Sequence, residues 1–324
     1  MDRFKWRIVA FCILTFSCWL LMYGTWRALP FVQAGFEQIY SLKSRIISEG
    51  RVFPSGLPRR LVILGDSRVL SGFNPDQFDA LSGGSIYSYN LGLPNASQFL
   101  AILESLVANG EAPTHVLLTF PWPKTKDGVW LSALLRDDQA ILNRLFPFRH
   151  IARDMAKFAV RSVGQGGLGS YRNSVMGLVE RAKKDRGYFF MAGMSHFPDD
   201  RLPDDFYIES ERPDFVLSRA YSFEDPNFFR LLKIGKEHNI RFIIVPTYYR
   251  EGLYAPAGSN RADRIALRNH GIELLGPDYW LYPNRAFSDP THLNPNGAEA
   301  HTRRLWDLLQ PVIGSEIRTG SAES

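Results

Sequence analysis

The stretch Leu61-Val62-Ile63-Leu64-Gly65-Asp66-Ser67-Arg68 decides the expected fold of this 324-residue chain. Its four consecutive apolar residues are typical of a parallel β-strand that is buried on both faces of a sheet. The glycine, aspartate and serine that follow favour a tight turn and the start of a helix. The stretch therefore predicts the strand-to-helix turn of a βα unit.

The same alternation of strand and helix continues along the chain. Asn294 followed by Pro295 is a typical helix start, and it predicts a closing helix over residues 295–309. A further helix is predicted over residues 226–238. Strands are predicted over residues 61–64, 85–91, 115–120, 241–245 and 272–275. This order predicts an α/β fold, a doubly wound parallel sheet covered by helices in three layers.

Two segments stand apart from this α/β pattern. Between about residues 122 and 222 the rhythm is lost, which predicts a mainly helical and irregular insertion. Residues 27–58 are predicted to form a stem that ends in glycines and prolines. The α/β domain itself is predicted over residues 59–313, with a flexible tail over residues 314–324.

The amino-terminal region predicts a membrane anchor. Residues 8–26 contain no charge, and these 19 residues would span roughly 28 Å as a helix, about the thickness of a bilayer core. A cleaved signal peptide is the alternative, but its apolar core would be shorter. Arg3, Lys5 and Arg7 precede the span, so residues 1–7 are predicted to be cytoplasmic and the rest exported.

Composition excludes several classes of protein. With 45% hydrophobic and 22% charged residues, the chain is not mostly disordered. Cys12 and Cys18 both lie in the predicted span, so the exported part forms no disulfide, which agrees with a bacterial periplasm. The net charge of +5 is dispersed, and we expect no nucleic-acid partner. We also expect no metal and no cofactor, because no ligand spacing or phosphate loop is present.

Two short motifs predict nucleophilic chemistry. Ser67 follows the first strand, and ligands bind beyond the carboxyl ends of the strands of such sheets. Asp289-Pro290-Thr291-His292 can supply a base and the carboxylate that orients it from one loop, which a serine nucleophile needs. The alternative is that Gly-Asp-Ser is merely a turn and that Asp289 caps a turn beside an incidental His292.

As an ordered set, these motifs resemble those of the SGNH, or GDSL, hydrolase superfamily, over most of residues 60–310 outside the insertion. The resemblance implies a flavodoxin-like, SGNH-type fold in which Ser67 is the nucleophile, His292 the general base and Asp289 its orienter. Asn90-Leu91-Gly92 resembles the second motif, which implies that the backbone N–H groups of Ser67 and Gly92 form an oxyanion hole.

One motif of the superfamily is absent. Phe120-Pro121-Trp122-Pro123 stands where the superfamily has Gly-x-Asn-Asp, which removes an expected asparagine donor. Asn95 is a candidate replacement in the oxyanion hole and is equally a candidate helix cap.

The anchor, the missing asparagine and the insertion resemble membrane-bound members of the superfamily that modify polymers, such as polysaccharide O-acetylation and teichoic-acid D-alanylation proteins. That resemblance implies a serine-dependent O-acyltransferase with a polysaccharide substrate, working beside a membrane-bound O-acyltransferase on the outer side of the cytoplasmic (inner) membrane. An esterase or deacetylase acting on glycan or lipid esters is one alternative. A non-catalytic glycan-binding or scaffold protein is the other.

Four further residues are candidate substrate contacts. Arg68 can hold an anionic group or pair with a nearby carboxylate, and His196 can touch substrate or be an ordinary loop histidine. The rings of Trp122 and Tyr248 can stack on a sugar or pack in the core.

Overall fold

The chain divides into two compact units, which are described separately. The computed structural model describes residues 2–28, 35–92, 99–119, 146, 148, 151–164, 166–190, 197–217, 226–258 and 261–320. One unit comprises Met1–Ile39 and Lys126–Val179, and the other comprises Tyr40–Thr125 and Glu180–Ser324. The second unit contains every strand of the described residues and is called the α/β unit below.

The first unit is helical in its described residues. Helix α1 (Asp2–Ala28) contains a segment, Arg3–Ala28, that is long and apolar enough to span a membrane, with a mean hydropathy of 1.9. Helix α7 (Ile151–Gly164) and the first part of α8 (Leu168–Lys184) also belong to this unit. The chain therefore has one amino-terminal helix of the length and composition that a single-pass anchor requires.

The α/β unit is built on a parallel sheet of five strands in the order β2-β1-β3-β4-β6. The strands are β1 (Arg60–Leu64), β2 (Tyr87–Asn90), β3 (His115–Leu118), β4 (Arg241–Ile244) and β6 (Ile272–Leu274). The first strand lies between the second and the third, so the chain changes direction across the sheet beside β1. In such sheets the crevice at this reversal is the usual ligand site.

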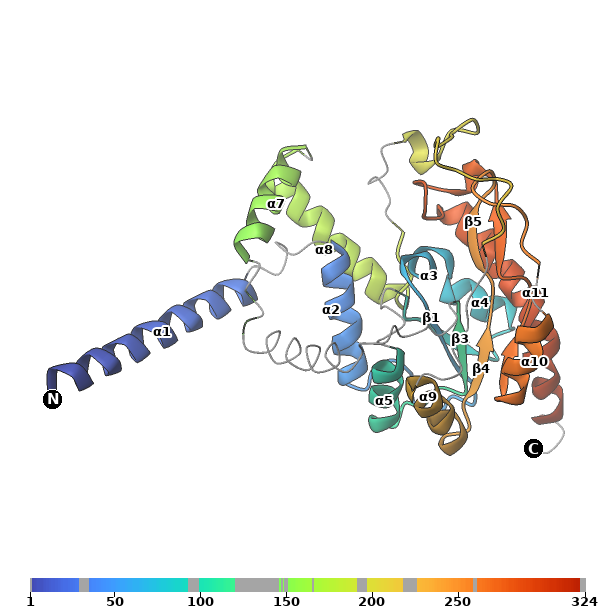
Figure 1. The fold of residues 1–324 in the computed structure, drawn as a ribbon, viewed down its shortest axis with the longest axis horizontal. Coiled ribbons are helices and arrows are strands. Elements are labelled where there is room, and N and C mark those ends of the chain that lie inside the picture. The colour runs from blue at the N-terminus through green and yellow to red at the C-terminus, as the bar shows by residue number, and fades with distance from the viewer. Residues whose placement is uncertain are drawn as a thin grey trace. The chain divides into compact units, whose positions relative to one another are not determined.

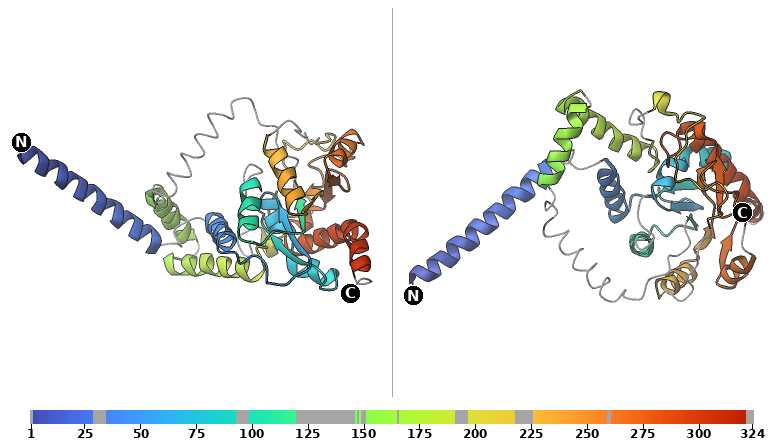
Figure 2. Two further views of the ribbon diagram at one scale, coloured as in Figure 1. Left: turned by 90° about the horizontal axis from the view of Figure 1, so that it is seen from below. Right: turned by 45° about the horizontal axis from the view of Figure 1, so that its top comes forward.

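Helices cover both faces of this sheet (Figures 1 and 2). Helices α5 (Phe99–Ala108) and α9 (Pro226–Glu237) pack together on one face. Helices α3 (Ser67–Gly72), α4 (Pro75–Leu81) and α11 (Pro295–Gly320) pack together on the other face, and α10 (Arg261–Asn269) packs against β6. The α/β prediction and its parallel sheet are confirmed, and the layering is compatible with a three-layer fold.

The main apolar core lies under α3, α4 and α11. Its residues come from the central strands and from these helices, as the burial of Ile63, Phe73, Leu117 and Leu305 shows. Phe78 of α4 packs edge-on against Trp306 of α11, with ring centroids 5.5 Å apart. This core fixes α4 and α11 against each other.

A second, two-stranded parallel sheet was not predicted from the sequence. It pairs β5 (Thr247–Arg250) with β7 (Tyr279–Tyr282), close to the short helical turn η4 (Asn284–Ala286). The sequence alone identifies its tyrosine-rich segments only as a group of aromatic residues. The pairing joins residues about thirty positions apart, which no local pattern specifies.

Much of the predicted stem is part of the α/β unit. Helix α2 (Gly35–Ser48) is amphipathic, and its Leu42, Ile46 and Ile47 side chains are buried. The Glu111 carboxylate accepts hydrogen bonds from the backbone N–H groups of Val52 and Phe53, at 3.2 and 3.0 Å. Residues 40–58 of the predicted stem therefore lie within the α/β unit, because burial of an apolar helix face joins this segment to it.

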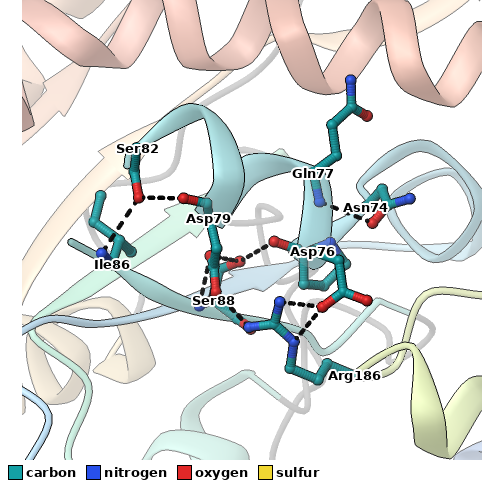
Figure 3. A network of polar contacts seen from close by, with 9 residues as sticks. Asn74, Asp76, Gln77, Asp79, Ser82, Ile86, Ser88 and Arg186 are labelled. Atoms are coloured by element: carbon teal, nitrogen blue, oxygen red, sulfur yellow. Dashed lines mark hydrogen bonds and ion pairs between the residues drawn. The ribbon is translucent and has the colours of Figure 1, made fainter. Parts of the chain in front are cut away.

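Only part of the predicted insertion, residues 122–222, lies outside the α/β unit. The chain from Glu180 onward belongs to that unit. Arg186 pairs with Asp76 and Asp79 and donates to the Ser88 carbonyl at 3.1 Å, as Figure 3 shows. Its own carbonyl accepts from Asn90 N–H at 2.9 Å, so this turn covers the exposed edge of β2. The described residues after η3 (Pro198–Asp200) are tied in similarly, by a buried ion pair between Glu211 and Arg250.

The carboxyl-terminal helix begins as predicted and ends later. The Asn294 side chain accepts from Gly297 N–H at 3.0 Å, which confirms the helix cap. Helix α11 continues to Gly320, past the predicted end at Leu309 and into the predicted flexible tail. Pro311 lies inside the helix, although proline usually ends one.

Candidate active site

Ser67, His292 and Asp289 form one chain of hydrogen bonds. Ser67 Oγ lies 2.9 Å from His292 Nε2, and His292 Nδ1 lies 2.8 Å from Asp289 Oδ2. Ser67 is the first residue of α3, just beyond β1, and the other two lie on the loop before α11. The structure thus brings together three groups from segments that lie far apart in the sequence. With the Nδ1 proton held by the carboxylate, Nε2 is the ring nitrogen that can accept the serine proton.

The loop around Asp289 holds its carboxylate in the ionised form. Its Oδ1 accepts from the backbone N–H groups of Thr291 and His292, both at 2.8 Å, which leaves Oδ2 for the imidazole. Partial burial opposes ionisation, but the hydrogen bonds and charge of His292 and the two N–H donors outweigh it and hold the pKa of Asp289 below its ordinary value. The aspartate is therefore anionic at neutral pH and suited to orienting the base.

The turn that carries Ser67 is set by local hydrogen bonding and by close packing. Asp66 is the N-cap of α3, and its Oδ1 accepts from Arg68 N–H at 2.8 Å. A Cβ atom at Gly65 would lie 2.2 Å from Thr119 Oγ1 and 2.3 Å from Val69 Cγ2. Only glycine fits there, so the Gly-Asp-Ser sequence is explained by the turn as well as by chemistry.

Tyr248 is a positioning residue and not the predicted substrate contact. Its side chain is 1% exposed, and burial raises the pKa of its hydroxyl, which stays protonated. That hydroxyl donates to the Arg68 carbonyl at 3.0 Å and accepts from Leu293 N–H at 3.4 Å. It also lies 3.0 Å from Ser71 Oγ, which donates to the Ser67 carbonyl. Tyr248 therefore joins the turn of the serine to the loop of the histidine.

The predicted oxyanion donors differ from each other in the structure. Ser67 N–H lies in the first turn of α3, where a helix has no acceptor of its own for the backbone N–H groups. Gly92 N–H donates to Asn90 Oδ1 at 2.9 Å. The prediction of Gly92 as a free oxyanion donor is therefore not met in this arrangement, because a side chain two residues earlier already takes its proton.

Gly92 instead allows β2 to approach α3 closely. A Cβ atom there would lie 2.4 Å from Leu70 N. Asn90 Nδ2 reinforces the contact by donating to the carbonyls of Val69 and Phe73, at 2.8 and 2.7 Å. A polar side chain at the buried end of a predicted strand was the sequence signal for this network, since such a group needs partners.

Lys43 of α2 is a further polar residue of this region that sequence reasoning missed. Its Nζ donates to the Gly92 carbonyl at 2.8 Å, and its side chain is buried. Burial lowers its pKa well below the ordinary value of a lysine. Together, Lys43 and Asn90 hold both backbone groups of Gly92, so the turn after β2 is fixed from two sides.

Arg68 lies beside the serine but is engaged by other residues. Its guanidinium pairs with Asp66 Oδ2 at 2.8 Å and lies over the ring of Tyr249, 4.6 Å from the centroid. This is the pairing with a nearby carboxylate that was the alternative to substrate binding. An incoming anion would compete with Asp66 for the same guanidinium.

Asn95, Trp122 and His196 lie outside the residues that the structure describes. Within the described ranges, no group of three or more histidine, cysteine, aspartate or glutamate side chains is placed to hold a metal ion.

Comparisons of the chain with protein-family models, with curated proteins and with solved structures find no match. The geometry of Ser67, His292 and Asp289 therefore carries the functional conclusion.

Proposed function

We propose that this protein is a membrane-anchored, serine-dependent O-acyltransferase, an O-acetyltransferase in the simplest case, that modifies a cell-envelope or secreted polysaccharide. The observation that carries the proposal is the continuous Ser67–His292–Asp289 hydrogen-bond chain at the carboxyl end of β1. The ordered motifs support an SGNH-type, flavodoxin-like domain, and the strand order of the sheet is consistent with it.

In the first half-reaction, His292 accepts the Ser67 proton while Oγ attacks the acyl carbonyl of the donor. The bond from the acyl carbon to the donor's leaving group breaks, and His292 returns the proton to that group. An acyl ester on Ser67 remains. Ser67 N–H is the donor suited to stabilise the oxyanion of each tetrahedral intermediate.

In the second half-reaction, a sugar hydroxyl attacks this ester. His292 accepts the hydroxyl proton, the bond between Ser67 Oγ and the acyl carbon breaks, and the proton returns to the serine. Asp289 stabilises the imidazolium that forms in both steps. The sequence resemblance supports a membrane-bound O-acyltransferase as the partner that supplies the acyl group.

The proposed location follows from α1. The apolar segment Arg3–Ala28 supports a single span, and the basic residues ahead of it support a cytoplasmic amino terminus. The α/β unit then lies outside the cytoplasmic membrane, in the periplasm or another extracytoplasmic space, where it meets the polymer.

A non-catalytic glycan-binding or scaffold protein is the second candidate. The observation that favours it is the Gly92 N–H group, which donates to Asn90 and leaves the predicted oxyanion hole with fewer free donors. An esterase or deacetylase would use the same triad with water in place of the sugar hydroxyl.

The test compares acylation of the polymer in cells that express Ser67→Ala or His292→Ala. We expect each variant to lose acylation by more than about 1,000-fold, since both groups take part in every proton transfer. Ser105→Ala in α5 and His238→Ala at the end of α9 are matched controls, because both side chains are exposed. Unchanged acylation in both active-site variants would overturn the proposal in favour of the non-catalytic candidate.

A second measurement separates the transferase from the esterase. The purified full-length chain is incubated with a chromogenic acetyl ester, with and without a soluble glycan. Transfer of the acetyl group to the glycan supports the transferase. Release of acetate at the same rate in both incubations, with no acetylated glycan, identifies an esterase.

A further inference from the structure

A cavity of about 630 Å³ lies outside the triad, within the α/β unit. Its volume is in the range of small-ligand sites. Among the residues that line it are Arg181, Asp185, Tyr188, Phe190, Glu299 and Arg303. The chemistry proposed for Ser67 uses none of them.

Hydrogen bonds between distant segments fix the walls of this cavity. Phe189 N–H donates to the Leu70 carbonyl at 3.0 Å, which ties the aromatic wall to α3. Asn74 N–H, at the start of α4, donates to Thr302 Oγ1 of α11 at 3.0 Å. The cavity is therefore preformed, and a ligand would lose little affinity to reorganisation of the protein.

The cavity also contains polar groups that are available to a ligand. Tyr188 is 9% exposed, and no hydrogen bond joins its hydroxyl to another described residue. Asp185 lies nearby, where burial, followed by the charge of Asp76, raises the pKa of its carboxyl. Because this hydroxyl has no hydrogen-bond partner among the described residues, it is suited to bind a ligand that enters the cavity.

The charges of the lining are balanced. Arg181 and Arg303 contribute two guanidinium groups, Asp185 and Glu299 contribute two carboxylates, and the other lining residues are neutral. Arg303 and Glu299 lie 3.5 Å apart as an exposed pair. Such a lining offers both donors and acceptors but favours neither an anion nor a cation.

We propose that this cavity binds a neutral sugar ring. Aromatic faces, here those of Tyr188 and Phe190, pack against the C–H face of a pyranose, while guanidinium and carboxylate groups hydrogen-bond its hydroxyls. An acyl chain would make no use of these donors and acceptors, whereas sugar hydroxyls can accept from the guanidinium groups and donate to the carboxylates.

The cavity shares its supporting elements with the triad. Leu70, which holds the aromatic wall, belongs to the helix that begins at Ser67. Pro295, also a lining residue, follows His292 by three positions. The inference rests on the proposed function only for its role, which is to hold one unit of the polymer while another unit reaches Ser67.

The test is calorimetric titration of the full-length chain in detergent, carrying Ser67→Ala so that no turnover occurs. The probes are four neutral tetrasaccharides, those of β-1,4-glucose, α-1,4-glucose, β-1,4-mannose and β-1,4-N-acetylglucosamine. Tetragalacturonate and fully deacetylated chitotetraose serve as anionic and cationic probes. We expect at least one neutral probe to bind with a Kd between about 10 μM and 5 mM, and more tightly than either charged probe.

Variants of the cavity then decide where the probe binds. Phe190→Ala and Arg303→Ala should each weaken binding by about 10-fold or more, and Tyr188→Phe, which removes one hydroxyl, by about 5-fold. Phe229→Ala and Arg230→Ala are matched controls on α9, where both side chains are exposed. Thermal unfolding checks each variant, and Tyr188→Phe keeps the test decisive if Phe190→Ala fails to fold.

Three results would overturn the inference, namely no binding of any neutral probe, binding of charged probes only, or neutral binding that Tyr188→Phe and Arg303→Ala leave unchanged. Its failure is distinguishable from failure of the proposed function. If only the inference fails, no sugar binds in the cavity but acylation in cells still requires Ser67. If only the proposed function fails, sugar still binds in the cavity but acylation does not depend on Ser67.

Discussion

The triad and the cavity beside Tyr188 share α3 and the start of α11, but they arrange their polar groups differently. In the triad, Ser67, His292 and Asp289 hydrogen-bond to one another in series. In the cavity, the Tyr188 hydroxyl makes no hydrogen bond to another described residue, and charged residues of both signs line the space. Proton transfer needs groups that are already aligned with each other, whereas ligand binding needs groups whose hydrogen-bonding capacity is not used within the protein.

The largest expected effect concerns catalysis at the triad and leaves sugar binding in the cavity unchanged. Asp289→Asn keeps the size of the side chain but removes the charge that holds the Nδ1 proton of His292, so we expect the acyl-transfer rate to fall by roughly 1,000-fold. Neutral-sugar binding in the cavity should not change. The rate is measured with a chromogenic acetyl ester, and Asp204→Asn, at an exposed aspartate, is the control. A fall of less than about 10-fold would mean that Asp289 does not orient the base.

A second prediction concerns the packing under the triad. Gly92→Ala places a Cβ atom 2.4 Å from Leu70 N, so β2 and α3 must move apart. We expect the free energy of unfolding to fall by about 3 kcal/mol. Denaturant unfolding measures it, with Gly258→Ala as the control because its Cβ atom would meet open space. Unchanged stability would show that the chain at Gly92 packs against α3 loosely enough to accept a Cβ atom.

The third prediction uses α11, the helix common to both regions. His301 is buried there, and burial, followed by the charge of Arg304, lowers its pKa to about 3. Below pH 6.5 the unfolded chain therefore binds a proton at this position that the folded chain does not bind. Stability should fall as the pH decreases, by about 2 kcal/mol between pH 6.5 and 5 from this residue alone.

Denaturant unfolding at several pH values tests this prediction. His301→Gln should flatten the decrease, whereas His238→Ala, at an exposed histidine, should leave it unchanged. The same slope in His301→Gln as in the unsubstituted chain would show that His301 already binds a proton in the folded state.

The smallest expected effect is the change in kcat when Tyr248 loses its hydroxyl. Tyr248→Phe removes the hydroxyl that joins Arg68 to Leu293, so the serine turn and the histidine loop lose a common support. We expect kcat to fall by about 10-fold with KM nearly unchanged, since the hydroxyl acts on alignment and not on substrate binding. Steady-state kinetics measures both, with Tyr207→Phe, at an exposed tyrosine, as the control. A rise in KM with kcat unchanged would indicate instead that Tyr248 contacts the substrate.

Local patterns made much of the fold and the three triad residues predictable. Strand β1, the cap at Asn294 and the Asp289 to His292 loop each depend on contacts within a few residues of sequence. The boundaries of the stem, the insertion and the final helix were predicted less well. Burial of the α2 face and the ion pairs of Arg186 decide the boundaries of the stem and the insertion, and both involve partners far along the chain.

Residue type and short spacing along the chain set which residues can begin a strand, cap a helix, span a membrane or act as nucleophile, base and orienter, so these properties follow from the amino-acid sequence. Only the tertiary structure decided that Asn90 takes the Gly92 proton, that Tyr248 is buried and that a cavity opens beside Tyr188. Each of these depends on which distant segments the order of the strands places side by side, and a linear pattern does not specify that order.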